Sequence, residues 1–231
     1  MLHQLVVPLV VGFAAGAALR PVVAALIVPV GHPICAAGPV HPRSLYGLLL
    51  TTGRDHSGHW GVPCLLEVTT AAAFAAVAAG GASGWYAVAQ YWIAFLGAGL
   101  LLIDSAVQRL PNVLTLHAGA GTLVLLTAAA AAGEHGSLSR AVAVAAAAGA
   151  LFTAAALGGM GLGDAKLAVS LGALLGWHSW QAALVALVTS YFLGAVVAIV
   201  LLVTGRQHRK SHLAFGPFLI IGTLATLVTS T

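Results

Sequence analysis

Long apolar runs, separated by short polar or Gly/Pro-rich breaks, dominate the pattern of this 231-residue chain. An apolar run of about 20 residues is long enough to cross a bilayer as a helix. The pattern predicts eight spans, the sixth and seventh being separated by the segment GWHSW. The expected spans are 5–29, 64–82, 85–103, 112–132, 140–158, 165–177, 179–203 and 213–230. We therefore expect an all-α polytopic membrane protein with about eight transmembrane helices.

The one long polar segment, residues 31–62, divides the chain into three parts. Residues 1–30 are expected to form a first transmembrane helix, because this apolar run is too long for a signal-peptide core and lacks a basic start. Residues 31–62 are expected to form a small extramembrane loop or subdomain. Residues 63–231 would then form the main transmembrane domain.

The composition agrees with a membrane protein. The chain is 60% hydrophobic and only 6% charged, whereas about a quarter of the residues in a soluble domain are charged. The net charge of +4 comes from a few scattered cations, which does not indicate a nucleic-acid partner. Two cysteines, Cys35 and Cys64, do not make a disulfide framework. The expected environment is the lipid bilayer, and the pattern gives no oligomeric state.

The basic residues predict the orientation of the spans. With eight spans, most of them fall on one side, and only Arg140 lies in a loop on the other, while Arg20 lies inside the first span. The basic residues on the more positive side are Arg43, Arg54, Arg109, Lys166, Arg206, Arg209 and Lys210. The positive-inside rule makes this side cytoplasmic. Asp104 and Asp164 fall on the same side.

Asp104 and Asp164 are the acidic residues that point to chemistry, because each lies at the edge of an apolar helix. An aspartate deep in the bilayer costs about 2.5–3.5 kcal/mol and usually marks function. Two neighbouring carboxylates cannot both ionise, so one can activate a water while the other protonates the scissile carbonyl. We expect Gly161 and Gly163 to allow an unusual backbone turn and the close approach of a substrate strand.

Both aspartates could instead have structural roles. Asp164 could cap the following helix, and Asp104 could form an interfacial ion pair near Ser105 and Arg109. A proton-coupled transporter is a functional alternative, since membrane aspartates also relay protons. That function would need further acids along a path through the membrane, and only Glu67 comes close.

Three segments resemble one family. GMGLGDAKL resembles the GxGD signature of type IV prepilin peptidases, which are aspartic proteases of the bacterial inner membrane. IDSAVQRLPNVLTL is similar to the family's segment around its first aspartate, and FGPFLIIGTLATL to the opening of its last helix. The resemblance runs from about residue 62 to the end of the sequence. It implies a GxGD aspartic protease bundle.

The resemblance also implies a reaction. The family removes the basic leader of prepilins or pseudopilins on the cytoplasmic side, after a glycine and just before the substrate's hydrophobic helix. By motif match, the catalytic pair would be Asp104 and Asp164, Gly161 and Gly163 would shape the site, and Asn112 and Lys166 would support it. Lys166 could also be only a positive-inside anchor. A GxGD intramembrane protease with different substrates and a catalytically silent scaffold would fit the same motifs.

The chain departs from the family in the polar loop. Many members also methylate the new N-terminus with S-adenosylmethionine and carry two zinc-binding CxxC pairs there. This chain has HPIC and HSGH instead, so a zinc site would use His32, Cys35, His56 and His59. These residues could equally be solvated parts of a decayed loop. We expect a peptidase that needs no cofactor, with methylation and S-adenosylmethionine in doubt. GVPCLLEVTTAAAF resembles the family's next stretch, which gives Glu67 a structural or supporting role.

Overall fold

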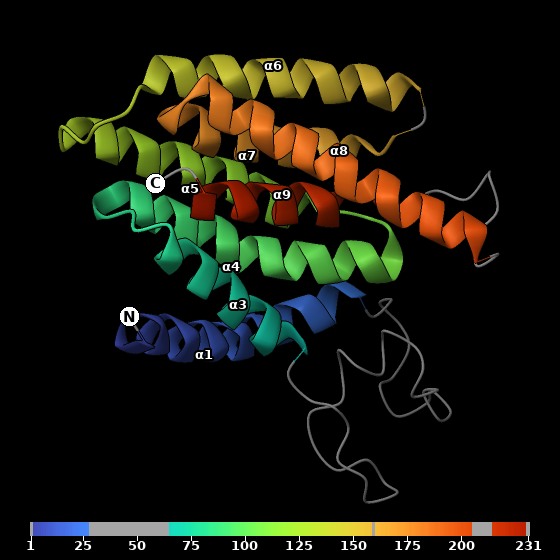
Figure 1. Cartoon of the computed structure of the whole chain (residues 1–231), viewed down its shortest axis with the longest axis horizontal. Helices are drawn as coiled ribbons and strands as arrows, with labels where there is room; N and C mark the ends of the chain where they lie inside the picture. Colours follow the sequence, from blue (N-terminus) through green and yellow to red (C-terminus); the bar gives the residue numbers. More distant parts are fainter. Residues whose placement is uncertain (1, 28–64, 159, 205–213, 230–231) are drawn as a thin grey trace, which may run out of the picture.

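The computed structural model describes residues 2–27, 65–158, 160–204 and 214–229. These residues form eight α-helices that run back and forth along one direction (Figure 1). The helices are α1 (Leu2–Ile27), α3 (Leu65–Ala79), α4 (Gly84–Val107), α5 (Asn112–Ala131), α6 (Leu138–Leu157), α7 (Leu162–His178), α8 (Trp180–Val203) and α9 (Gly216–Thr229).

The helices agree with the predicted spans. Five of the helices in the described residues are long and apolar enough to cross a membrane, and α3 and α9 are shorter apolar helices. Ser179 alone separates α7 from α8, so the predicted break at GWHSW is confirmed. Because consecutive helices alternate in direction, the end of α4 and the starts of α5, α7 and α9 lie at one end of the bundle (Figure 1). The chain is an all-helical, multi-pass membrane protein.

Helix α7 is the centre of the bundle. It packs against α4, α5, α6, α8 and α9, and most of its residues are buried, although Leu162, Lys166 and Val169 are exposed. Small residues allow this close packing, because a Cβ on Gly172 would lie 3.1 Å from the Cβ of Ala148, and one on Gly176 would lie 2.7 Å from the Cβ of Val144. The neighbouring helices also bury Asp164, in the first turn of α7.

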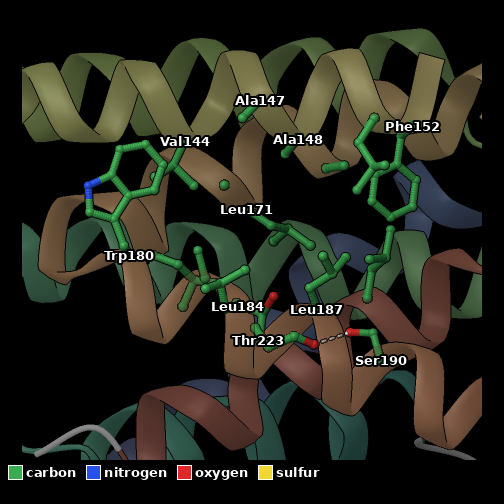
Figure 2. A pocket seen from close by; sticks show the side chains of 17 residues that line it. Val144, Ala147, Ala148, Phe152, Leu171, Trp180, Leu184, Leu187, Ser190 and Thr223 are labelled. Carbon is green, nitrogen blue, oxygen red and sulfur yellow. Dashed lines mark hydrogen bonds between the residues drawn. The ribbon is translucent and has the colours of Figure 1, made fainter. Parts of the chain in front are cut away.

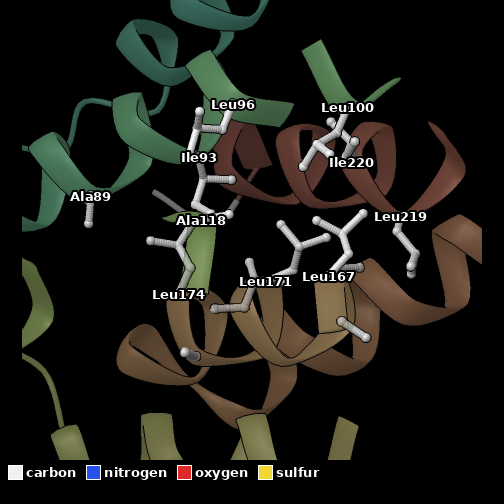
Figure 3. Close-up of a cluster of buried hydrophobic side chains, with 14 of the residues drawn as sticks. Ala89, Ile93, Leu96, Leu100, Ala118, Leu167, Leu171, Leu174, Leu219 and Ile220 are labelled. Atoms are coloured by element: carbon white, nitrogen blue, oxygen red, sulfur yellow. The ribbon is translucent and has the colours of Figure 1, made fainter. Parts of the chain in front are cut away.

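The main core joins α7 to its neighbours through branched aliphatic side chains. Figure 3 shows Leu167, Leu171 and Leu174 of α7 facing residues from α4, α5 and α9. Leu174 and Leu100 are fully buried. Burying such a side chain contributes about 1.5–3 kcal/mol relative to leaving it in water. In the membrane, however, packing contacts rather than water exclusion fix how the helices meet.

Two charged residues cap helices at the end of the bundle opposite the aspartates. The carboxylate of Glu134 accepts hydrogen bonds from the backbone N–H groups of Trp85 and Tyr86, at the start of α4. The guanidinium of Arg140 donates to the carbonyl oxygens of Gly176, Trp177 and His178, at the end of α7. Each charge is opposite in sign to the partial charge of the helix end that it caps, so each stabilises its helix. Arg140 is therefore explained by capping, although it departs from the positive-inside pattern.

Helices α1 and α3 form a close antiparallel pair. A Cβ on Gly12 would lie 2.7 Å from Ala71 Cα, and one on Gly16 would lie 2.6 Å from Glu67 Cα. The four-residue spacing of these glycines is a common signature of helices in close contact within membranes. One turn further along α1, Arg20 forms an ion pair with Glu67, and both side chains are largely buried. Glu67 is thus the partner of the charge inside the first span.

We expect this pair to matter for stability. Arg20→Met leaves the Glu67 carboxylate buried without its cation, so the free energy of unfolding should fall by about 3–5 kcal/mol. The double variant Arg20→Met/Glu67→Gln should recover most of that loss, because no unpaired charge remains. Unfolding by denaturant in detergent micelles measures both. Losses that simply add in the double variant would contradict the coupling.

Candidate active site

Asp104 lies in the last turn of α4 and is only 4% exposed. The helix ends just after it, because Gln108 takes a left-handed conformation with φ 53° and its N–H donates to the Asp104 carbonyl oxygen. A single left-handed residue is a common way to stop a helix. The apolar turns that precede it, with Leu100 and Ile103 fully buried, anchor the aspartate at the edge of the core.

Asp164 lies in the first turn of α7 and is 7% exposed. The hypothesis that this residue caps the helix is wrong, since α7 begins at Leu162 and Gly161 occupies the N-cap position. An ion pair between Asp104 and Arg109 is not seen either. Within the described parts of the chain, the ion pair found is the one between Arg20 and Glu67, and Asp104 Oδ2 is buried without a hydrogen-bond partner.

Gly216, the first residue of α9, brings the two carboxylates together. A Cβ on Gly216 would lie 2.7 Å from Asp104 Oδ2 and 3.5 Å from Asp164 Oδ1. The two oxygens are therefore no further apart than the sum of these distances. The backbone amide of Gly216 is within interaction range of both side chains. Three helices that are far apart in the sequence thus meet at one point, and two carboxyl groups lie close to the same glycine there.

The glycines of the GLGD segment have a different role from the expected one. Gly161 has φ −68° and ψ 134°, which any residue can adopt, and Gly163 lies within the helix. The expected unusual turn is therefore wrong. A Cβ on Gly163 would lie 2.8 Å from the Cβ of Leu110, so this glycine admits the chain that links α4 to α5. A Cβ on Gly161 would make only ordinary contacts, at 3.7 Å from Asp164 Oδ2 and 4.0 Å from the Gly163 backbone nitrogen.

A polar cavity of about 840 Å³ opens beside the aspartates. It lies where α4, α5, α7 and α9 begin or end, at the edge of the apolar bundle. The lining includes Asp104, Gln108, Arg109, Leu110, Asn112, Met160, Gly161, Gly163, Asp164, Lys166 and Phe215. Six of the residues that the sequence nominated are therefore brought to one cavity. Its volume lies within the range of ligand-binding clefts in proteins.

Lys166 and Asn112 form a tether at the rim of this cavity. The Lys166 ammonium donates a hydrogen bond to Asn112 Oδ1 at 2.7 Å, joining the start of α7 to the start of α5. An ammonium has three donors, so two can still reach a ligand in the cavity. Both side chains are exposed. The contact gives Lys166 a specific partner, which a lysine that merely anchors the helix in the lipid headgroups would not need.

The remaining candidates do not line this cavity. Glu67 pairs with Arg20 between α1 and α3, which agrees with a structural role. His32, Cys35, His56 and His59 lie outside the described residues, so the zinc site stays a prediction. In the described ranges, no group of three or more His, Cys, Asp or Glu side chains could hold a metal ion.

The sequence reasoning did not assign Phe215 and Gly216 to the site. Phe215 lines the cavity, and Gly216 lies against both aspartates. The FGPFL segment was the available signal, because its glycine and proline interrupt an otherwise apolar run. The order of residues along the chain could not show that Gly216 approaches Asp164 and Asp104, which lie far earlier in the sequence.

Comparisons with known proteins agree with the motifs. Residues 91–199 match the type IV leader peptidase family. A prepilin leader peptidase/N-methyltransferase from Aeromonas hydrophila is 35% identical over 173 residues, which are 71% of this chain and 57% of that relative. A protein of the same name from Burkholderia pseudomallei is 45% identical over 74 residues, covering 32% of this chain and 23% of the relative.

A shorter relative matches as well. Leader peptidase HopD from Escherichia coli is 46% identical over 63 residues, which are 26% of this chain and 38% of that protein. The matched part of the chain spans little more than half the length of the Aeromonas hydrophila relative. No solved structure matches this chain. The family match includes both aspartates, so the part of the chain that carries them is related to the type IV leader peptidase family.

Proposed function

We propose that this chain is a membrane aspartic endopeptidase that removes the basic leader of type IV prepilins or pseudopilins. The observation that carries the proposal is the meeting of Asp104 and Asp164 at Gly216, beside a polar cavity. The match of residues 91–199 to the type IV leader peptidase family and relatives named as prepilin leader peptidases support the substrate class. Such a substrate has an apolar helix just after its scissile bond.

The reaction follows from two carboxyl groups that hold one proton between them. The ionised carboxylate takes a proton from a water molecule, whose oxygen bonds to the scissile carbonyl carbon. The protonated carboxyl group gives its proton to the carbonyl oxygen. When the tetrahedral intermediate collapses, the C–N bond breaks and the leaving amine takes a proton from the pair. One hydroxyl group of the intermediate returns a proton to the pair as the new carboxyl group forms, so the pair again holds one proton. One water is consumed, and no cofactor is needed for this step.

The residues around the pair have supporting roles in this proposal. The Gly216 backbone fixes the separation of the carboxylates, and the tether between Lys166 and Asn112 holds the starts of α5 and α7 together. The free donors of Lys166 would bind backbone carbonyl groups of an extended substrate. Arg109 and Lys166 are exposed at this end of the bundle. By the positive-inside rule their charge supports an active site on the cytoplasmic side, and the relatives' function as prepilin leader peptidases leads us to propose the bacterial inner membrane as the location.

A proton-coupled transporter is not favoured. Such a protein would need buried acids along a path through the bundle. Among the residues that the structure describes, the other deeply buried acid is Glu67, which is paired with Arg20. It does not line the cavity beside the aspartates.

This proposal does not include methylation by S-adenosylmethionine. The residues of the polar loop lie outside the described ranges.

Replacing either aspartate should stop cleavage. We expect Asp104→Asn and Asp164→Asn each to lower leader removal at least about a hundredfold, since general acid–base groups contribute about 10²–10⁴-fold. Co-expression with a prepilin from the same genome, followed by gel shift and N-terminal mass, measures it. Glu134→Gln is the control, because this acid caps α4 at the opposite end. The same masses report any added methyl group. Equal cleavage by all four proteins would contradict the proposal.

The two glycines of the GLGD segment should differ in sensitivity. Gly163→Ala pushes a methyl group against Leu110, so we expect kcat/KM to fall about a hundredfold, the cost of an ångström-scale displacement of a reacting group. Gly161→Ala adds only an ordinary contact, so its loss should be far smaller. Purified variants in detergent, compared at equal folded concentration, give both values. The reverse order of losses would show that Gly163 does not set the position of Asp164.

A further inference from the structure

A second cavity, distinct from the polar one, lies between α6 and α8 with α7 as its floor (Figure 2). It has a volume of about 160 Å³. Figure 2 shows Val144, Ala147 and Ala148 of α6 facing Leu184 and Leu187 of α8. Its rim is open at the surface of the bundle, because Leu151 and Leu184 are 47% and 60% exposed. We call this feature the α6–α8 groove.

The groove is built for an apolar ligand. Its lining is aliphatic or aromatic except for Ser190 and Thr223, and the Ser190 hydroxyl already donates to the Ala186 carbonyl oxygen. On the rim, α6 presents Ala147 and Ala148 and α8 presents Ala183. Small residues of this kind let another helix approach closely in a membrane. The chemistry fits the side chains of one face of an apolar helix.

The floor of the groove continues to the active site along one helix face. Ala168, Leu171, Gly172 and Leu175 line the groove. They follow Asp164 by four, seven, eight and eleven residues, which is the spacing of a single face of an α-helix. A ligand that lies along this face therefore points toward the Asp164 carboxylate.

An aromatic cluster separates the groove from the polar cavity. The ring of Phe152, which lines the groove, is 6.0 Å from the ring of Phe215, which lines the cavity. Tyr191 completes the cluster, with its ring 4.9 Å from that of Phe215. The Phe152 and Phe215 rings thus separate the groove from the aspartates. One ligand could place an apolar segment in the groove and a polar backbone segment in the cavity.

We infer that the α6–α8 groove binds the apolar helix of the substrate, with the scissile bond beyond Phe152 and Phe215, at the aspartates. This inference rests on the proposed function, because such a substrate has its apolar helix next to the bond that is cut. A groove whose floor lies on the same face of α7 as Asp164, and which the Phe152 and Phe215 rings separate from the aspartates, serves this arrangement. A lipid acyl chain is the competing occupant.

The first test fills the groove. Ala147 lines it and its neighbour Ala146 does not, although both are exposed on α6. In proteoliposomes with a full-length prepilin, Ala147→Phe should raise KM about tenfold, as expected for overpacking a contact, and change kcat much less. Ala146→Phe, the matched control, should leave both unchanged. Equal kinetics of the two variants would overturn the inference while leaving the proposed function intact.

The second test does not depend on cleavage. In an Asp164→Asn background, with Cys35 and Cys64 replaced by serine, a single cysteine is introduced at position 147 or 146. A second cysteine is scanned along the apolar helix of the prepilin, and oxidation traps neighbouring pairs. We expect disulfides from Ala147→Cys at helical spacing on the substrate and none from Ala146→Cys. Trapping at neither position, with wild-type cleavage intact, would assign the groove to lipid.

Discussion

The close approach of α4, α7 and α9 at one end of the bundle is the constraint on which the site depends. Gly216 has no side chain, so its backbone reaches Asp104 and Asp164 at once. A larger residue there would separate the carboxylates or tilt α9. Because α7 is surrounded by five other helices, Asp164 cannot turn toward lipid. Packing of the three helices thus keeps the two carboxyl groups near each other.

Much of the fold could be predicted from the sequence, because helices that cross a membrane correspond to long apolar runs. All eight predicted spans correspond to helices in the described part of the chain, with ends that differ by a few residues. The pairing of Asp104 with Asp164 was also predictable, because alternating spans bring both to the same end. The motif resemblance then selected proteolysis from the functions that buried aspartates can serve.

The contacts between helices could not be predicted from the sequence. Hydropathy is high both for residues that face lipid and for residues that face other helices. The partner of Arg20 could not be named from the pattern, although Gly12 and Gly16 carried a signal for close packing that was missed. The expected turn at Gly161 and Gly163 was wrong for a related reason. A glycine can serve backbone freedom or close approach, and only the position of Leu110 shows that Gly163 serves the second.

The position of Gly216 has a consequence for where the working unit of this fold ends. The family match closes at residue 199 and contains both aspartates. Yet the backbone against which they are set belongs to α9, which begins at Gly216. A fragment cut to the boundaries of the match would keep the two acidic residues of the signature and lose the element that spaces them. The smallest unit with an intact geometry therefore extends through α9, beyond the residues that the family model matches.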